Sequence, residues 1–160
     1  MKIKENIKVD KEYQDRFFEG TDFQDFCVEK LYDKGFVVVP FSSRKYQIMY
    51  GESRTGVEFK YDKRFRKTGN FYIETDAKQK NDTKYHKEGI YREDNTVFWC
   101  IGDYEGIYLL SKKQLQQIHK KGIMKEVTTD TSKGFLLPVD YTRKYLTIME
   151  VKWAKVKSLI

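Results

Sequence analysis

The first segment with a clear hydrophobic pattern has the spacing of an amphipathic helix. It follows Thr21-Asp22-Phe23-Gln24, which has the form of a capping box, and its apolar positions are Phe23, Phe26, Cys27 and Leu31. Gly35 stands where a helix commonly ends. The pattern therefore predicts a helix that begins at about Thr21. Residues 1–20 are polar and weakly patterned, so we expect an N-terminal arm there, or a short helix around 13–18.

Several apolar runs have the length and boundaries of β-strands. The run 36–41, FVVVPF, lies between Gly35 and a Ser-Ser pair and predicts a strand buried on nearly both faces. Further strands are expected at 46–50, 96–103, 106–110, 135–137 and 145–148. We expect 106–110 to return antiparallel beside 96–103. Ser111 and Gln114 form a second capping box, which predicts a helix that ends near Gly122.

Two stretches between these elements alternate strictly between apolar and charged or polar residues. They are GVEFKYD at 56–62 and FYIETDAK at 71–78, separated by the basic segment DKRFRKTG. We expect them to form a hairpin with a basic tip. A register that pairs Phe59 with Ile73 also places Glu58 opposite Glu74, with the side chains roughly 5 Å apart.

Length and element order indicate one domain of the α+β class. A chain of 160 residues is long enough for one hydrophobic core and short for two. The mixture of helices and strands predicts a mixed β-sheet flanked by helices. We therefore expect a single domain at 21–160, preceded by the arm at 1–20.

Charge and cysteine content limit the partners and the compartment. Lys and Arg outnumber Asp and Glu by 31 to 24, and the resulting charge of +7 suits a polyanion such as DNA. Cys27 and Cys100 stand among apolar neighbours without metal-type spacing, which is typical of reduced core cysteines. The sequence has no signal-peptide pattern and no apolar segment near the roughly 20 residues of a membrane span. We therefore expect a cytoplasmic protein without a membrane partner.

The expected pair of Glu58 and Glu74 is the first candidate for chemistry. Two facing carboxylates repel each other unless a cation lies between them, and that cation is either Lys60 or a divalent metal such as Mg²⁺. Beside a metal, the Lys60 ammonium could orient or help deprotonate a water and stabilise a phosphate. We expect the tip residues Lys63, Arg64, Arg66 and Lys67 to bind the DNA backbone, and Phe65 or Trp153 to stack on bases.

These residues resemble the PD-(D/E)xK, or restriction-endonuclease-like, nucleases. That core has a helix, a buried strand and a strand pair that carries an acid and a Glu-x-Lys triplet, and Glu58-Phe59-Lys60 stands where the triplet would. The string GVEFKYDKRFRKTGNFYIE is similar to a branch often found in phages and mobile elements, and EGIYREDNTVFWCIGDYEGIYLLSKKQL is similar to its continuation. The resemblance covers roughly residues 22–118 and implies a restriction-endonuclease-like core.

The resemblance also implies a role for each matching side chain. Glu58 would be the metal-binding acid of the triplet, Lys60 its lysine and Glu74 an added acid. The family's earlier acid, usually an Asp after Pro, is matched best by Glu52, where neither Pro nor Asp is present. All four are expected catalytic residues, and the three acids are the expected ligands of Mg²⁺, or of Mn²⁺ in its place. Glu29, on the first helix, is a further candidate.

A second match to the family pattern remains open. It takes Glu58 as the earlier acid and Asp76-Ala77-Lys78 as the triplet. We prefer the first match because Lys78 falls near a strand end, in a polar and lysine-rich stretch.

The sequence thus predicts an Mg²⁺-dependent DNA endonuclease that hydrolyses phosphodiester bonds with metal-activated water, in phage DNA processing or restriction-type defence. A homodimer is one expected form, since many nucleases of this fold dimerise to cut both strands. The alternative is a non-catalytic module on the same fold. Such a module would bind nucleic acid or a protein, as a phage inhibitor of a host defence does.

Overall fold

The structure is a computed structural model that describes residues 11–152, with only the backbone given for 11–14, 17 and 18. Its helices are α1 (Lys11–Asp33), α2 (Arg44–Tyr50), α3 (Phe65–Thr68), α4 (Lys112–Lys120) and α5 (Val139–Tyr141). Its strands are β1 (Val57–Tyr61), β2 (Asn70–Ala77), β3 (His86–Lys87), β4 (Phe98–Asp103), β5 (Gly106–Ser111), β6 (Lys125–Thr128), β7 (Ser132–Pro138) and β8 (Thr147–Lys152). A 3-10 turn at Gly89–Tyr91 and a π-helical turn at Thr142–Leu146 complete the fold.

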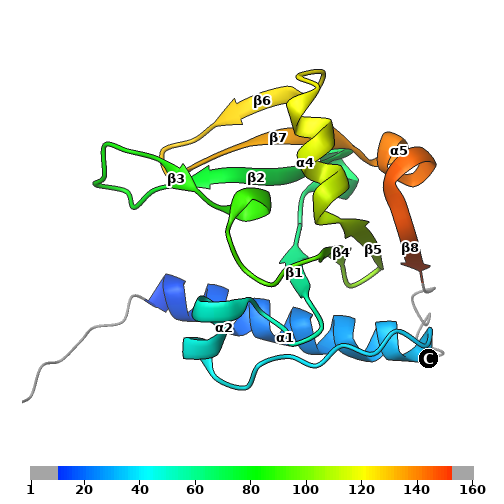
Figure 1. The fold of residues 1–160 in the computed structure, drawn as a ribbon. Coiled ribbons are helices and arrows are strands. Elements are labelled where there is room, and N and C mark those ends of the chain that lie inside the picture. The colour runs from blue at the N-terminus through cyan, green and yellow to red at the C-terminus, as the bar shows by residue number, and fades with distance from the viewer. Residues whose placement is uncertain (1–10, 153–160) are drawn as a thin grey trace, which may run out of the picture.

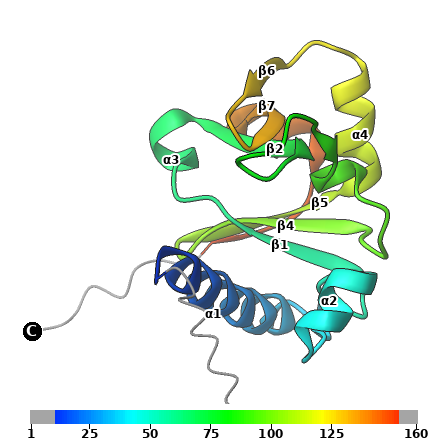
Figure 2. The ribbon, with the colours of Figure 1, turned by 90° about the vertical axis from the view of Figure 1, so that its left-hand side faces the viewer.

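The strands form two four-stranded sheets that share no strand. The first sheet has the order β1-β4-β5-β8, in which β1 is parallel to β4 and the other neighbours are antiparallel. The second sheet has the order β3-β2-β7-β6 and is antiparallel throughout. The first sheet lies between α1 on one side and the second sheet with α4 on the other (Figure 1; Figure 2). This arrangement confirms the α+β class and the presence of a mixed sheet flanked by helices.

The lower core lies between α1 and the first sheet. Phe23, Cys27 and Leu31 are fully or almost fully buried against alternate residues of the strands, as their helical spacing requires. The strand residues of this core are Val57, Phe59, Cys100, Ile107, Leu109 and Val151. Both cysteines are buried and free, which confirms their predicted place in the core.

The upper core lies on the other face of the same sheet. Trp99 and Ile101 of β4, with Tyr108 and Leu110 of β5, pack there against side chains of β2, β7 and α4. Since both faces of β4 and β5 are covered, their sequences are continuous apolar runs rather than alternating ones. The antiparallel pairing of β4 with β5, and the helix capped by Ser111, confirm the predictions for 96–122.

Four local predictions are wrong. The first helix begins at Lys11 and passes through Thr21 without interruption, so the expected boundary at residue 20 falls inside α1, and residues 1–10 lie outside the described part. The run 36–41 forms only an isolated bridge from Pro40 to Ser53, and Val37 is 58% exposed. The segment 46–50 is helical. Finally, β1 and β2 do not pair with each other, since each belongs to a different sheet.

The failure of the predicted hairpin has a local cause. After β1, both oxygens of Asp62 accept backbone N–H groups, Oδ1 from Arg64 and Phe65 and Oδ2 from Tyr72. The two bonds to Oδ1 hold the backbone where the short helix α3 begins, and Gly69 ends this helix with a left-handed φ of 72°. The basic segment is therefore a helical turn that carries the chain from one sheet to the other.

Candidate functional site

The Glu-x-Lys residues lie on the face of β1 that is directed away from α1. Val57 and Phe59 belong to the lower core, and the alternation of the strand places Glu58 and Lys60 on the opposite face. The parallel register sets Glu58 beside Trp99 and Lys60 beside Ile101. Because β1 is the edge strand of its sheet, this charged face borders a pocket rather than a neighbouring strand.

Lys60 is held by electrostatic contacts on two sides. Its Nζ lies 2.5 Å from Oε1 of Glu58 and 5.1 Å from the centre of the Trp99 ring. Burial by itself lowers the pKa of Lys60, but attraction to Glu58 and then Glu52 outweighs burial and raises the pKa above its ordinary value. Lys60 is therefore a protonated cation at neutral pH.

Glu58 is the most buried charge of the site. Its side chain is only 7% exposed, and Oε2 has no hydrogen-bond partner among the described residues. The indole N–H of neighbouring Trp99 is likewise buried without a partner in the described part of the chain. Each buried polar atom without a partner is costly, and a bound water, ion or ligand would relieve that cost.

Glu52 approaches the same group from the loop after α2. Its Oε2 accepts the backbone N–H of Phe59 at 2.7 Å, which fixes the carboxylate beside β1. Burial raises the pKa of Glu52 to about 7, opposed by Lys60 and assisted by the negative charge of Glu58. A glutamate with this pKa lies in surroundings that disfavour another negative charge.

Glu74 comes from the second sheet, on the face of β2 opposite to buried Phe71 and Ile73. Burial raises its pKa, while the nearby Lys60 lowers it and Glu88 raises it again. The adjacent turn approaches β2 closely at Gly89, where a Cβ atom would lie 2.0 Å from the backbone oxygen of Glu74 and φ is 55°. Glycine at this position allows the contact that holds Glu74 in place.

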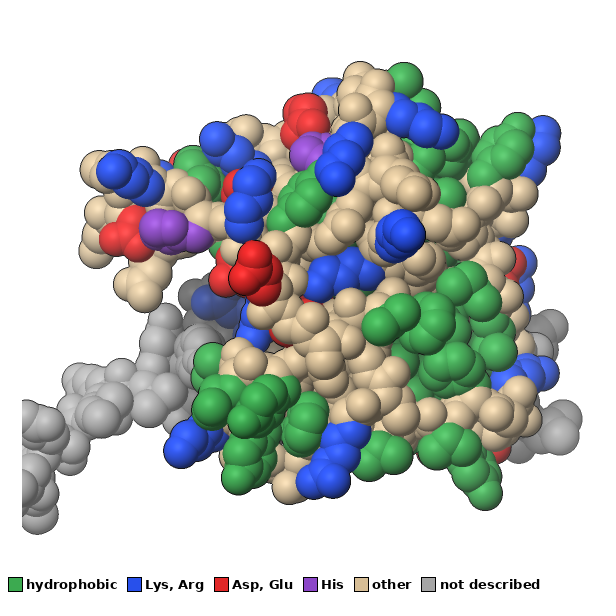
Figure 3. All heavy atoms as spheres, in the orientation of Figure 1, with side chains coloured by type: hydrophobic (Ala, Val, Ile, Leu, Met, Phe, Trp, Pro, Cys, Tyr) green, Lys and Arg blue, Asp and Glu red, His purple; other side chains and the backbone are tan. Residues whose placement is uncertain are grey.

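Two pockets that share lining residues give access to Lys60, Glu74 and Glu52, whereas Glu58 is not among the described lining residues of either pocket. One is a cavity of about 580 Å³ whose walls include Lys60, Glu74 and Trp99, and the other is a cavity of about 440 Å³ whose walls include Glu52 and Arg44. Arg16, Gly20 and Phe59 line both. Figure 3 shows acidic and basic side chains together on the face between the second sheet and α2. The site therefore has a negatively charged centre within a basic rim.

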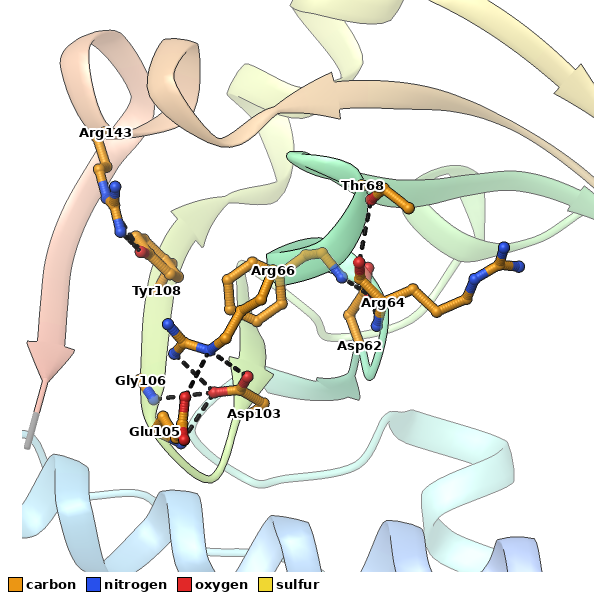
Figure 4. Close-up of polar contacts among 10 residues, drawn as sticks. Asp62, Arg64, Arg66, Thr68, Asp103, Glu105, Gly106, Tyr108 and Arg143 are labelled. Atoms are coloured by element: carbon orange, nitrogen blue, oxygen red, sulfur yellow. Dashed lines mark hydrogen bonds and ion pairs between the residues drawn. The ribbon is translucent and has the colours of Figure 1, made fainter. Parts of the chain in front are cut away.

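The four predicted DNA-binding residues separate into two groups. Lys63 and Arg64 line the larger pocket, and Lys63 forms an ion pair with Glu19 of α1. Arg66 extends in the opposite direction from Arg64 (Figure 4) and binds Asp103 with two bonds, Nε to Oδ2 at 2.5 Å and Nη2 to Oδ1 at 2.8 Å. Lys67 is exposed and is not among the described residues that line either pocket.

The two expected base-stacking residues have different outcomes. Phe65 is only 2% exposed and packs on Phe71 and Tyr108 in the upper core, so the prediction that it stacks on bases is wrong. Trp153 lies outside the described residues.

The open alternatives of the sequence lie away from this group. Asp76 accepts the Thr75 hydroxyl at 2.7 Å and pairs with Lys87 at 3.0 Å, while Lys78 donates to the backbone oxygen of Asp82. Glu29 pairs with Lys30 on the outside of α1. None of these three is among the described lining residues of the two pockets. Glu52, Lys60 and Glu74, by contrast, each line one of the two pockets.

The carboxylates meet the needs of Mg²⁺ in part. Within residues 11–152, no three His, Cys, Asp or Glu side chains stand close enough together to hold a metal ion. Mg²⁺, however, commonly uses one or two protein carboxylates and completes its shell with waters and substrate phosphates. The negative charges of Glu52 and Glu58 repel each other, and these two carboxylates are the number of protein ligands that such a site uses.

Comparison of the chain with models of protein families, with curated proteins and with solved structures found no match in any of the three. A function can therefore be inferred only from the sequence, the fold and the side chains. Over the described residues, no helix combines the length and the apolar character needed to span a bilayer.

Sequence reasoning missed Arg16, Arg44 and Trp99 as parts of the site. Arg16 falls in a segment without clear pattern, and Arg44 lies just before the run 46–50 that was expected to be a strand. Trp99 belongs to the predicted strand run 96–103, and the face of its buried ring lies beneath Lys60 in the wall of the larger pocket. Its register with Glu58 is a non-local contact that no sequence pattern reveals.

Proposed function

We propose that the protein is an Mg²⁺-dependent phosphodiesterase that cleaves DNA, with a core related to the restriction-endonuclease-like nucleases. The observation that carries this proposal is the buried and unpaired Oε2 of Glu58 beside Glu52 and Lys60. Three glutamates act on one lysine, so either a further cation or protonation of Glu52 or Glu74 would balance the charge. The basic rim of Arg16, Lys63 and Arg64 suits the phosphates of a nucleic acid.

Glu52 and Glu58 are the residues that would hold the ion. Mg²⁺, when bound, would supply positive charge that polarises a water and the scissile phosphate. Oε2 of Glu58 has no partner among the described residues and would be the oxygen for the ion, while Oε1 pairs with Lys60, whose flexible side chain could turn away without movement of β1. The Lys60 ammonium then becomes available to the phosphate across the pocket.

The protonation states assign different roles to Lys60 and Glu74. The raised pKa of Lys60 keeps it charged, so it stabilises negative charge on the phosphate instead of removing a proton from water. Glu74 lines the same pocket and has a raised pKa, which suits a group that accepts a proton from the attacking water. Asp62 has no such role, because its oxygens accept the backbone N–H groups of Arg64 and Tyr72.

The deciding experiment is incubation of the full chain with plasmid and linear DNA in Mg²⁺, Mn²⁺ or EDTA. We expect cleavage in both metals and none in EDTA. Glu58→Ala and Lys60→Ala should each lower the rate by at least about 100-fold, the loss typical of a group that stabilises transition-state charge. Glu29→Ala is the matched control, since Glu29 is exposed on α1 and should leave the rate unchanged. Full cleavage by both site variants would show that these residues are not catalytic.

A non-catalytic DNA-binding module is the second candidate, and one observation favours it. The 2.5 Å pair of Lys60 and Glu58 already neutralises one carboxylate without any metal. This function predicts affinity for DNA that falls steeply with salt and no cleavage with any divalent ion.

A further inference from the structure

Helix α2 presents an aromatic surface that the proposed catalytic group does not use. Its sequence RKYQIMY contains four large apolar side chains, yet none of its seven residues, all of which the structure describes, is buried. Tyr46 and Tyr50 are each 48% exposed, and Ile48 is 61% exposed. In the space-filling view, hydrophobic side chains gather over α2 (Figure 3).

Polar contacts, rather than packing, hold α2 in place. The Gln47 side-chain amide donates to the Phe41 backbone oxygen at 2.8 Å, and Arg92 Nη2 donates to the backbone oxygens of Gln47 and Ile48. The backbone N–H of Asn95 donates to the oxygen of Tyr50. None of these bonds involves a tyrosine side chain, so they would remain in a variant without the rings.

Three aromatic rings form a triangle on this surface, which we call the aromatic cluster: Phe41, Tyr46 and Tyr50. Their centres are 5.9 to 6.2 Å apart, and the two tyrosine rings are inclined by only 26°. The Arg54 guanidinium lies 5.5 Å from the centre of the Phe41 ring. Flat rings beside a cation are the combination with which proteins hold unpaired bases and their phosphates.

Two other residues of α2 connect the aromatic cluster to the smaller pocket. Arg44, the first residue of α2, and Gln47 line the smaller pocket together with Glu52. Glu52 follows Tyr50 by two residues along the chain. A strand whose phosphates enter that pocket would thus pass its next bases over the tyrosines.

We propose that the aromatic cluster stacks unpaired bases of a single-stranded DNA segment that leads into the smaller pocket, which Glu52 lines. The basic character of Arg44 and Arg54 beside the rings favours a polyanion over an apolar protein segment. The faces of the bases are stacked on one another within a duplex but are accessible in a single strand. The aromatic cluster therefore selects single-stranded or locally unpaired DNA. The choice of DNA as ligand rests on the proposed function, whereas the stacking itself needs no metal and no cleavage.

The test measures binding of the full chain, in EDTA, to fluorescently labelled oligothymidylate and to its duplex with oligoadenylate. Tyr46→Ala/Tyr50→Ala should weaken single-strand binding by at least about 5-fold and by up to about 150-fold, the range for loss of one stacked base. Duplex binding should change by less than about twofold. Tyr46→Phe/Tyr50→Phe should bind as the wild type does, because stacking needs the ring and not the hydroxyl. Tyr32→Ala is the control, since Tyr32 is 67% exposed on α1.

Several results would overturn the inference. They are an equal loss for single strands and duplex, a loss that the Phe variant does not restore, absence of single-strand binding, and self-association of the wild type that the Ala variant abolishes. The two proposals can fail separately, because binding is measured without metal. If the protein prefers single strands, if that preference depends on the aromatic cluster, and if no Mg²⁺-dependent cleavage occurs, the result would support the stacking surface and contradict the nuclease. Cleavage without that preference would do the reverse.

Discussion

Two lysines of this protein are held by carboxylates inside the fold, and their surroundings differ in charge balance. Lys112 donates to Asp94 at 3.0 Å and to the backbone oxygen of Arg92 at 2.6 Å, and Arg92 lies 3.6 Å from the same aspartate. Lys60 instead shares its one charge among Glu58, Glu52 and Glu74. The first group has more cations than anions, and the second has more anions than cations.

The pKa values follow this difference. Burial raises the pKa of Asp94, but the Thr96 N–H and Lys112 lower it by more, so the pKa lies below its usual value. Burial raises the pKa of Glu52 to about 7, because Lys60 and the Phe59 N–H lower it by less than burial and the charge of Glu58 raise it. We call Lys112 and Asp94 the balanced pair, because cations suffice to neutralise the buried aspartate, and we call Lys60 with its three glutamates the unbalanced group, because carboxylates are in excess there.

The largest expected effect concerns the balanced pair. Lys112→Met should lower the free energy of unfolding by about 3 kcal/mol, because Asp94 is then left buried with only the more distant Arg92 as a charged partner. Urea denaturation followed by circular dichroism measures this loss. Lys113→Met, at the next and exposed position of α4, is the control and should change stability by less than about 0.5 kcal/mol. A small effect at Lys112 would remove the contrast between the two lysines.

An intermediate effect of opposite sign is expected at the unbalanced group. The folded pKa of Glu52 lies above its unfolded value of 4.5, so its contribution to stability is fully present below pH 4.5 and is lost as the pH rises through about 7. Glu52→Gln stays neutral and can still accept the Phe59 N–H. At pH 8 in EDTA it should therefore raise the free energy of unfolding, on the order of 2 kcal/mol, and at pH 4.5 it should change little.

Denaturation of both proteins at the two pH values checks this prediction. Glu29→Gln is the matched control, because Glu29 lies exposed on α1. A destabilised Glu52→Gln protein at pH 8 would mean that the carboxylate of Glu52 is already compensated in the fold.

The smallest expected effects distinguish two arginines of one short segment. Arg64 lines the larger pocket, so Arg64→Ala should weaken DNA binding modestly and reduce the slope of affinity against salt by about 1. Arg66 is paired with Asp103, so Arg66→Ala should leave that slope unchanged and lower stability by up to about 1 kcal/mol. Titrations of labelled DNA at several salt concentrations measure the slopes. Equal slopes for the two variants would contradict the division of the basic segment.

Local patterns predicted many elements and failed where one short run fits two structures. The continuous apolar runs of β4 and β5, and the cap at Ser111, are specific enough to be assigned from sequence. The run YQIMY is equally compatible with a strand and with a helix of two turns, and α2 adopts the helix. The run FVVVPF has a buried composition, yet Val37 and Val39 face outward because no neighbouring strand receives them.

The sequence by itself determined which side chains of β1 share a face. Alternation at a period of two residues is a property of the backbone, so Glu58 and Lys60 lie together, opposite Val57 and Phe59, whatever the strand pairs with. Only the tertiary structure decided what those charges meet. The hydrogen bonds of Asp62 and the left-handed turn at Gly69 direct the chain into a second sheet, and β1 pairs with the distant β4. Glu58 therefore lies beside Trp99, and Glu74 acts on Lys60 across a pocket, because strand pairing and burial depend on contacts far apart in the chain.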